Sequence, residues 1–290
     1  MVLSKPDRPA QRTAALDRIV ASALEEDLGE HGSDITTEAV VDPKLMGEAV
    51  IVARQPGVLS GANAAARVFE LVSPPCDYRP LVADGAHVSA GNQVALVTGP
   101  LGSILTAERT ALNFLQRLSG IATATRRYAD ALAPFPKVTL LDTRKTTPGL
   151  RFLERAAVRA GGGTNHRDGL WDAILIKDNH VAAAGGVAAA IERSRRARMP
   201  VEVEVDTVEQ LREALDAGAE TILLDNMSPE LMRRSVEITA GRARLEASGG
   251  MTLDGAVAAA QAGVGRISVG ALTHSAPALD LSLEVTKTWR

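Results

Sequence analysis

Six short apolar segments alternate with alanine-rich segments over the second half of the chain, after Pro136. They are VTLL (138–141), AILI (173–176), VEVEV (201–205), TILL (221–224), RLEA (244–247) and RISV (266–269). The last four begin roughly one strand–helix unit apart, and such repetition is typical of a parallel sheet whose strands are joined by helical crossovers. The tandem order favours an α/β barrel over an open sheet, and it leaves closure of the barrel open.

The first half of the chain has a different pattern. Apolar residues recur at helical spacing over 14–28 and again over 103–133, which predicts two helical regions. We expect Ser119 and Gly120 to divide the second region into two helices. Short apolar runs separated by turn signals predict strands at 50–53, 58–61 and 94–97. The first half is therefore predicted to be an α+β domain.

Each strand predicted after Pro136 ends in polar residues or glycine. These positions are 142–145, 177–180, 204–206, 225–226, 248–250 and 270. In a β/α barrel the active site lies at the C-terminal ends of the strands. We therefore expect these positions to share one face of the molecule and to form its functional site.

The alternation of side chains along a strand sharpens this expectation. Successive side chains point to opposite faces of a sheet, so Leu175 and Lys177 share a face. If the valines of VEVEV pack under the helices, both Glu202 and Glu204 point into the barrel. Glu202 then lies deep and is expected to be a buried, paired charge, whereas Glu204 lies near the mouth.

The composition argues against several classes of function. The 290 residues include 32 Lys and Arg against 35 Asp and Glu, a net charge of −3, which argues against general nucleic-acid or membrane-surface binding. Aromatic residues are 3%, so base-stacking platforms are not expected. Cys76 is the single cysteine and is expected to be inert, and its isolation suits a reducing, cytoplasmic location. Residues 1–12 lack the apolar run of a signal peptide.

Charges of opposite sign are predicted to meet at the functional face. The cationic side chains are Arg144, Lys145, His166, Arg167 and Lys177, and the anionic ones are Glu204 and Asp225. Gly249, Gly250 and Gly270 offer backbone N–H groups without side chains, a common way to hold phosphate. Such a site suits substrates with several negative charges and a cationic transition state between them.

Eight motifs, taken in order, resemble those of the quinolinate phosphoribosyltransferase family. They are ERTALN (108–113), DTRKTTPGLR (142–151), GGGTNHR (161–167), KDNH (177–180), EVEV (202–205), LLDNM (223–227), SGG (248–250) and VGALTHS (269–275). The resemblance runs from about residue 20 to the C-terminus. It implies an α/β protein with an N-terminal sandwich domain at 1–116, joined by 277–290, and an open, TIM-like catalytic barrel of six to seven parallel strands at 117–276.

The resemblance also implies the activity. Quinolinate and phosphoribosyl pyrophosphate would give nicotinate mononucleotide, pyrophosphate and carbon dioxide, a step of NAD biosynthesis. Mg²⁺ would act mainly through the substrate pyrophosphate, near Glu204 and Asp225, and no organic cofactor would be needed. A cytoplasmic homodimer or larger homo-oligomer with shared active sites is implied, without nucleic-acid or membrane partners.

Site residues follow from the same match. Thr143, Arg144, Lys145, His166, Arg167 and Lys177 match the quinolinate- and pyrophosphate-binding positions, and Glu204 and Asp225 match the ribose and magnesium side. Ser248, Gly249 and Gly250, with Val269, Gly270 and Ala271, match the loops that hold the 5′-phosphate. Among these, Lys145, Lys177, Glu204 and Asp225 are the expected catalytic residues. Arg109 matches an arginine that completes the site of the neighbouring subunit.

Three alternatives stay open from the sequence. Lys177 ends an apolar strand, as the lysine of a Schiff-base aldolase would. A non-catalytic sensor of phosphorylated sugars would use the same cations, but would have little use for Glu204 and Asp225. A phosphoribosyltransferase acting on nicotinate or a related pyridine would share nearly the whole site, because selecting two carboxylates over one can rest on a single arginine.

Overall fold

The computed structural model describes residues 8–30 and 32–290. Residues 1–7 lie outside these ranges. They are the first part of the segment that is predicted not to be a signal peptide. The described residues divide into two compact units. Unit 1 contains those up to Thr123, together with Pro148–Gly161 and Ala276–Arg290; unit 2 contains Ala124–Thr147 and Gly162–Ser275. The domain boundaries at 116/117 and 276/277 stay predictions.

Unit 1 is built on an antiparallel sheet with strand order β12-β1-β5-β3. The strands are β1 (Met46–Ala53), β3 (Asp77–Pro80), β5 (Gln93–Pro100) and β12 (Leu281–Trp289), beside a small hairpin of β2 (Gly57–Val58) and β4 (His87–Val88). The helices are α1 (Arg8–Leu28), α2 (Ile35–Val40), α3 (Ala62–Leu71), α5 (Arg151–Ala160) and the first part of α4 (Leu101–Leu132). The α+β pattern predicted for the first half is confirmed.

The last strand of the chain completes this sheet. β12 pairs along the whole of β1, from Met46 opposite Trp289 to Ala53 opposite Leu281. Fully buried side chains of β1, α3 and α4, including Ile51, Phe69 and Leu115, form the core. Cys76 is buried in this unit, and burial raises the pKa of its thiol to about 11.

Unit 2 is a parallel sheet with the order β6-β11-β10-β9-β8-β7. Its strands are β6 (Thr139–Leu141), β7 (Ile174–Ile176), β8 (Val201–Val205), β9 (Thr221–Asp225), β10 (Arg244–Ser248) and β11 (Arg266–Ser268). All six predicted strands are confirmed. Thr164 adds one isolated parallel bridge to Leu141, which marks the position where a seventh strand would lie.

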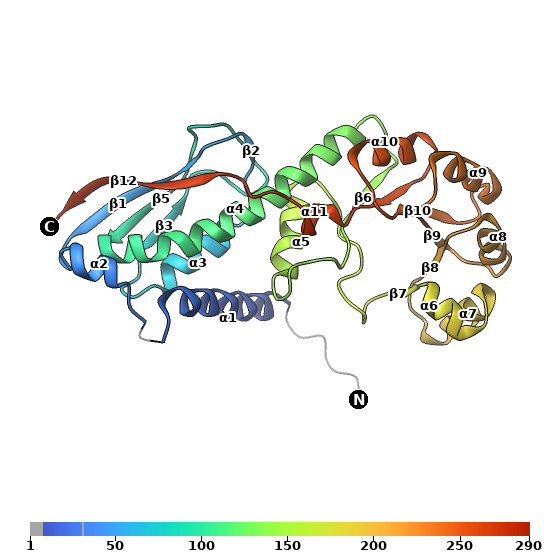
Figure 1. Cartoon of the computed structure of the whole chain (residues 1–290), viewed down its shortest axis with the longest axis horizontal. Coiled ribbons are helices and arrows are strands. Elements are labelled where there is room, and N and C mark those ends of the chain that lie inside the picture. Colours follow the sequence, from blue (N-terminus) through green and yellow to red (C-terminus); the bar gives the residue numbers. More distant parts are fainter. Residues whose placement is uncertain (1–7, 31) are drawn as a thin grey trace. The chain divides into compact units, whose positions relative to one another are not determined.

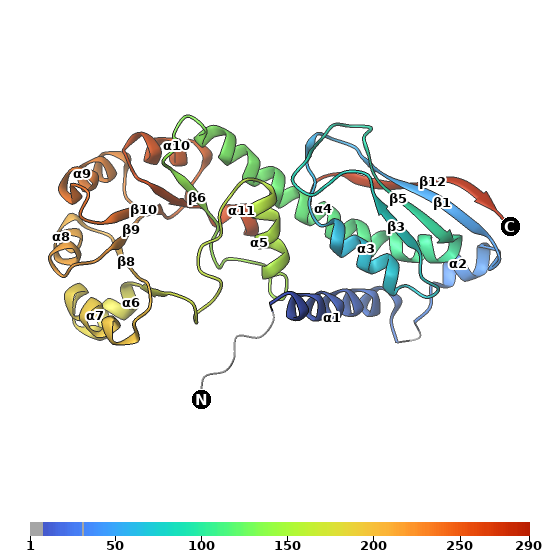
Figure 2. The same cartoon turned by 180° about the vertical axis from the view of Figure 1, so that it is seen from behind.

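Helices cover the outer side of this sheet in both views (Figures 1 and 2). They are α6 (Asp178–Ala184), α7 (Val187–Ser194), α8 (Val208–Asp216), α9 (Pro229–Thr239) and α10 (Leu253–Gln261), with the short α11 (Ala271–His274) after β11. Three of them begin at side-chain caps, because Thr207, Ser228 and Thr252 each accept a hydrogen bond from a backbone N–H of the first turn. Each cap fixes the residue at which its helix begins, and thereby limits the length of the loop that carries the polar residues after the preceding strand.

Alternation along β8 is as expected from the sequence. Val203 and Val205 are buried, and Glu202 is buried with them on the opposite side of the strand. Glu204, two residues further along, is partly buried. Both glutamates therefore point to the inner face of the curved sheet, and their valine neighbours pack beneath the helices.

The expected break at Ser119 and Gly120 is wrong, because α4 runs uninterrupted through both residues. Ser119 is buried, and its hydroxyl exchanges hydrogen bonds with the backbone of Ser60 at 2.9 and 3.1 Å. A Cβ atom at Gly120 would lie closer than 3.0 Å to the Pro277 carbonyl oxygen. These small residues let neighbouring backbone approach the helix, and they do not end it.

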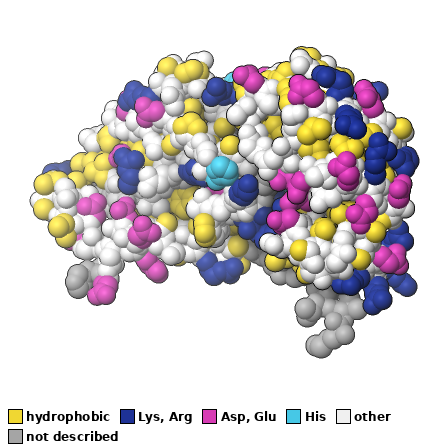
Figure 3. All heavy atoms as spheres, turned by 45° about the vertical axis from the view of Figure 1, so that its right-hand side comes forward, with side chains coloured by type: hydrophobic (Ala, Val, Ile, Leu, Met, Phe, Trp, Pro, Cys, Tyr) yellow, Lys and Arg dark blue, Asp and Glu magenta, His cyan; other side chains and the backbone are white. Residues whose placement is uncertain are grey.

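Charged side chains are mixed over the surface. Lys and Arg side chains lie among Asp and Glu side chains over much of the face drawn in Figure 3, in keeping with the small net charge. Among the described residues, every helix is too short or too polar to cross a bilayer.

The close contact at Gly120 predicts a large effect of one methyl group. We expect Gly120→Ala to lower the free energy of unfolding by about 2 kcal/mol, because the carbonyl of Pro277 must move. Gly102→Ala in the same helix is the control, since its Cβ would meet only Thr37 Cγ2 at 3.3 Å and alanine favours helix by up to about 1 kcal/mol. Urea unfolding measures both. Equal stability of the two variants would contradict the packing role.

Candidate functional site

A pocket of about 550 Å³ lies at the C-terminal ends of the strands of unit 2. Its lining consists of Asp142, Thr143, Arg144, Lys145, His166, Arg167, Leu175, Lys177, Leu223, Asp225, Asn226, Glu246, Ser248, Gly249, Gly250 and Ser268. The polar ends of the strands thus converge on one rim, where the sequence placed them. We call this cavity the rim pocket.

Lys177 and Glu204 form an ion pair at the rim. They leave the neighbouring strands β7 and β8, where Leu175 lies opposite Glu202 in register. Two residues further along, Lys177 Nζ meets Glu204 Oε2, and the side chain of Glu204 is 9% exposed while that of Lys177 is 47% exposed. Glu204 itself does not line the rim pocket, but its ion pair with Lys177, which does, connects it to the site.

The carboxylate of Asp225 is held from one side. Asn226 Nδ2 donates to Asp225 Oδ2 at 2.7 Å, and the Asn226 backbone N–H donates to the Ser248 carbonyl oxygen at 3.0 Å. Gly249, at φ +93°, packs against Asn226 so closely that a Cβ atom there would overlap it. The Asp225 loop and the Ser248–Gly250 loop therefore fit together only because position 249 has no side chain.

The loop after β6 presents the basic residues Arg144 and Lys145. The Thr143 hydroxyl accepts a hydrogen bond from Lys145 N at 3.1 Å, and the Thr273 hydroxyl donates to Lys145 O at 2.7 Å. Burial, and then the nearby charge of Arg144, lower the pKa of the Arg167 guanidinium. Like charges brought this close favour binding of an anion between them.

Asp142 is a site residue to which the sequence assigned no role. Its side chain is fully buried, although it carries a carboxyl group. Asn165 Nδ2 donates to Oδ2 at 2.6 Å, and the backbone N–H of His166 donates to Oδ1 at 2.7 Å. Asp142 therefore positions the irregular segment that presents His166 and Arg167. Its place directly after a predicted strand was the one available signal.

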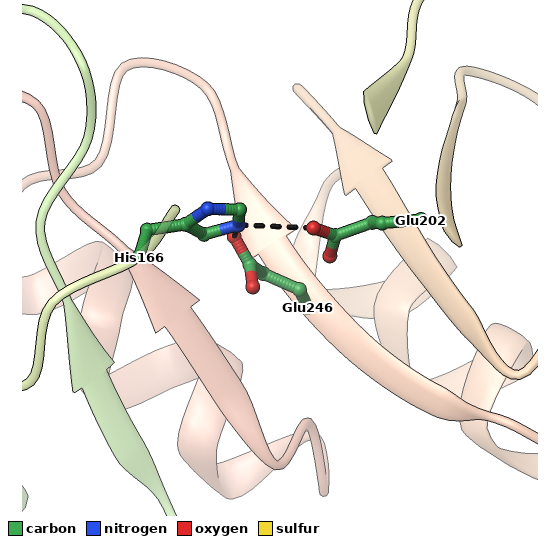
Figure 4. A group of neighbouring side chains, drawn as sticks. All are labelled: His166, Glu202 and Glu246. Atoms are coloured by element: carbon green, nitrogen blue, oxygen red, sulfur yellow. Dashed lines mark hydrogen bonds and ion pairs between the residues drawn. The ribbon is translucent and has the colours of Figure 1, made fainter. Parts of the chain in front are cut away.

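His166 is held by two glutamates from the inner face of the sheet (Figure 4). Its Nε2 lies 2.9 Å from Glu202 Oε2 and 3.4 Å from Glu246 Oε1. Glu246, on β10, is fully buried and receives a hydrogen bond from Arg266 Nε at 2.9 Å. The expectation that Glu202 is a buried, paired charge is confirmed, and Glu246 and Arg266 extend the cluster.

Opposing influences act on the protonation of His166. Burial disfavours the imidazolium ion, but the hydrogen bond to Glu202 and the nearby Glu246 outweigh it and raise the pKa of His166 to about 9. The backbone N–H of Arg167, 2.7 Å from Nδ1, opposes this rise, since it needs an unprotonated nitrogen. The raised pKa balances the charges: a neutral ring could still donate from Nε2 to Glu202, but among the described residues it would leave Arg266 as the one positive charge paired with the two carboxylates.

His166, Glu202 and Glu246 also have the composition of a metal site. One ligand atom from each lies within 4.8 Å of the others. The hydrogen bond to Glu202 and the ion pair between Glu246 and Arg266 already use two of their oxygens. The positive charge of a protonated His166 thus balances the two carboxylates, as a bound metal cation would.

Some residues singled out from the sequence lie beyond the rim pocket. Val269 is buried and donates its backbone N–H to Leu141 O, and Gly270 and Ala271 begin α11. Gly270 lies beside Lys145, because a Cβ atom there would meet Lys145 Cδ at 3.0 Å. Arg109 is exposed on α4, in the part that belongs to unit 1. Their binding roles stay predictions.

Comparison with known proteins finds one family over nearly the whole chain. The model of the quinolinate phosphoribosyl transferase N-terminal domain matches residues 34–119, and that of the C-terminal domain matches residues 121–284. A probable nicotinate-nucleotide pyrophosphorylase [carboxylating] of Bacillus subtilis is 44% identical over 264 residues, which cover 90% of each chain. The chloroplastic enzyme of that name from Arabidopsis thaliana is 41% identical, over 96% of this chain and 84% of the relative.

Solved structures agree. The nicotinate-nucleotide pyrophosphorylase of Francisella tularensis has a TM-score of 0.89 and 40% identity, over 94% of this chain and 96% of its own. That of Ehrlichia chaffeensis has a TM-score of 0.88 and 34% identity, over 99% of this chain and all of its own (100%).

The buried cluster predicts an unusual titration. We expect His166 to titrate near pH 9, and Glu202→Gln to lower that pKa because its strongest hydrogen-bonded charge is lost. The folded-state pKa lies above the ordinary 6.5, so the cluster stabilises most below about pH 6.5 and loses this contribution as pH rises through about 9.

The measurement is an NMR titration of the protein labelled with ¹⁵N-histidine. The signal of His166 is identified by its loss in His166→Asn, and the other histidine signals serve as internal controls that Glu202→Gln should leave unchanged. Titration of His166 at or below 6.5 in the parent protein, with Nδ1 unprotonated throughout, would show that the Arg167 N–H dominates.

Proposed function

Because the chain belongs to the quinolinate phosphoribosyltransferase family, we propose that it joins quinolinate to phosphoribosyl pyrophosphate and removes one carboxylate. The products are nicotinate mononucleotide, pyrophosphate and carbon dioxide, which makes the reaction a step of NAD biosynthesis. The observation that carries the proposal is the convergence of Arg144, Lys145, Lys177 and Asp225 on one pocket, with Glu204 paired to Lys177.

The cations suit the two acidic substrates. Quinolinate has two carboxylates on adjacent ring carbons, and guanidinium groups bind carboxylates through two parallel hydrogen bonds. Arg144 and Arg167 lie close enough for their charges to interact, so they offer a place for such a dianion. Lys145 and Lys177 are left to neutralise the charge that builds on the departing diphosphate.

The carboxylates suit the sugar. As the C1–O bond to diphosphate breaks, the ribose ring gains oxocarbenium character, and negative charges at Asp225 and Glu204 stabilise it. The pyridine nitrogen then forms the new bond to C1. Each well-placed charged contact contributes about 3 kcal/mol to the transition state.

Decarboxylation needs no further electron sink. Once its nitrogen is glycosylated, the pyridine ring is cationic and holds the electron pair that remains on the ring carbon when its C–C bond to the carboxylate breaks. The carboxylate leaves as carbon dioxide, and a proton from solvent replaces it on that carbon. No organic cofactor takes part in this proposal.

The donor set of the rim also fits Mg²⁺. Hard carboxylate oxygens are the ligands that this ion prefers, and it commonly binds through one or two of them together with substrate phosphates. Asp225, whose Oδ2 is the oxygen bonded to Asn226, and Glu204 would hold it together with the diphosphate. Bound there, Mg²⁺ would supply charge neutralisation to the leaving group.

A Schiff-base mechanism at Lys177 is disfavoured. Imine formation needs a neutral amine in a desolvated site. The side chain of Lys177 is 47% exposed and pairs with Glu204, so its surroundings are not the desolvated site that this chemistry needs. The same pair supports catalysis over mere sensing, because a carboxylate beside the cations weakens the binding of an anion that is never turned over.

We propose that the enzyme acts as a homodimer or larger homo-oligomer in the cytoplasm. Arg109, exposed on α4, is then available to complete the site of a neighbouring subunit. A reducing compartment suits a chain whose single cysteine is buried.

The activity is tested directly with quinolinate, phosphoribosyl pyrophosphate and Mg²⁺. We expect nicotinate mononucleotide and carbon dioxide in equal amounts, and no turnover when nicotinate replaces quinolinate. Turnover of nicotinate with similar kcat/KM would assign the enzyme to a different pyridine substrate.

Loss of a rim cation should abolish turnover. We expect Arg144→Ala and Lys177→Ala to lower kcat/KM at least about 100-fold with an unchanged unfolding midpoint, because each removes a charge that the transition state needs. Arg233→Ala, on the exposed side of α9, is the matched control and should retain full activity. Full activity in either rim variant would remove that residue from the site.

Shared sites are tested by mixing inactive variants. Arg109→Ala and Lys177→Ala should each be inactive alone, yet regain about a quarter of parental activity after mixing and subunit exchange, since each mixed dimer then has one intact site. Two variants of the same pocket, Arg144→Ala and Lys177→Ala, are the control pair and should not complement each other. Failure of the first pair to complement would place Arg109 outside the shared site.

A further inference from the structure

A second cavity, of about 440 Å³, lies at the opposite end of the strands of unit 2. It opens beside the N-terminal ends of β6, β10 and β11, where Thr139, Arg244 and Arg266 are the first residues of their strands. Lys137, before β6, and Thr239, the last residue of α9, complete its polar lining. We call it the base pocket. The rim pocket is formed by the C-terminal ends of the same sheet.

The charge of the base pocket is one-sided. Its lining includes the cations Lys137, Arg244 and Arg266, and no Asp or Glu among the described residues. Arg266 uses Nε for Glu246, and Arg244 donates from Nη2 to the Thr221 hydroxyl at 3.1 Å. Within the described ranges, neither Lys137 nor Arg244 makes an ion pair. Lys137 and Arg244 therefore carry positive charge without a counter-charge, whereas Arg266 is paired with Glu246. An anion bound between the two unpaired cations would remove the cost of their repulsion.

A buried hydroxyl independently points to a missing ligand. Thr239 is 2% exposed, lines the base pocket, and its Oγ1 has no hydrogen-bond partner within the part of the chain described. A threonine in a helix commonly donates to a carbonyl of the preceding turn, and a buried hydroxyl without a partner is destabilising. Thr239 thus has an unused hydrogen-bond donor in the lining of a pocket that also contains the unpaired cations Lys137 and Arg244.

We propose that the base pocket binds the phosphate group of a small phosphorylated metabolite, as a site separate from the rim pocket. Guanidinium groups match the oxygens of phosphate in pairs, a lysine supplies a point charge, and a hydroxyl supplies a further donor. The volume lies in the range of small-molecule sites and admits a mononucleotide.

The site is tested by calorimetric titration of the full-length protein with inorganic pyrophosphate and, separately, with adenosine 5′-monophosphate. Arg144→Ala/Lys145→Ala removes cations of the rim pocket, and Lys137→Ala/Arg244→Ala removes those of the base pocket. We expect Arg144→Ala/Lys145→Ala, the rim variant, to keep one anion site per chain. In Lys137→Ala/Arg244→Ala, the base variant, we expect the Kd of that site to rise more than about tenfold while turnover stays at the parental rate.

Thr239→Val separates binding from folding. Valine has nearly the same shape and no hydroxyl, so we expect an unchanged or higher unfolding midpoint without ligand, together with anion binding about fivefold weaker. Tighter binding of the monophosphate than of pyrophosphate would identify a phosphorylated nucleoside as the ligand, and the reverse order would identify free inorganic anions.

The proposal is overturned if the rim variant binds neither probe, or if Lys137→Ala/Arg244→Ala binds both as the parent protein does. These results are independent of the proposed reaction, because binding is measured without quinolinate. Absence of turnover in the parent protein would leave the binding result standing.

Discussion

Alternation along β8 is the constraint on which the charged interior of the barrel depends. Because Val203 and Val205 must pack beneath the helices, Glu202 and Glu204 can point only inward. The deeper glutamate then needs a positive partner, and His166 meets it at 2.9 Å. The outer one meets Lys177 at the rim. One pattern of five residues thus places both an internal structural charge and the carboxylate that pairs with a lysine of the pocket.

Buried charge is tolerated here because it is balanced. Glu202 and Glu246 face His166 and Arg266, so two negative and up to two positive charges share a small volume. Removing any one of them would leave an uncompensated charge where water is scarce, which is far more destabilising than removing an exposed ion pair. The cluster joins β8, β10 and β11 to the irregular segment that presents Arg167, so the shape of the rim pocket depends on this balance.

Much of the barrel was predictable, because its signals are local. Six apolar segments and the polar residues after them follow from the period of parallel strands and their crossovers, and each segment became a strand. The gathering of Arg144, Lys177 and Asp225 at one rim followed from the same rule. The inward direction of Glu202 also needed no more than side-chain alternation.

Other features depend on contacts between distant segments, which no local pattern reveals. Gly120 looked like a helix break, but it accommodates the carbonyl of Pro277, which is far away in the chain. Asp142 holds His166 through its backbone N–H, so no spacing of side chains pointed to it. Glu246 was hidden within an apolar strand, RLEA, and its partner Arg266 begins another. Residues of this kind become visible only when the strands are assembled.

The pairing of β12 with β1 has a consequence for synthesis of the protein. Domains commonly fold as they leave the ribosome, beginning with the N-terminal one. Here the edge of the first sheet is supplied by Leu281–Trp289, the last strand of the chain. Until residues 281–289 have been synthesised, β1 has an unpaired edge, which is prone to association with other chains. The unit that is made first is thus completed last, and a nascent chain stalled after the barrel would carry an exposed strand.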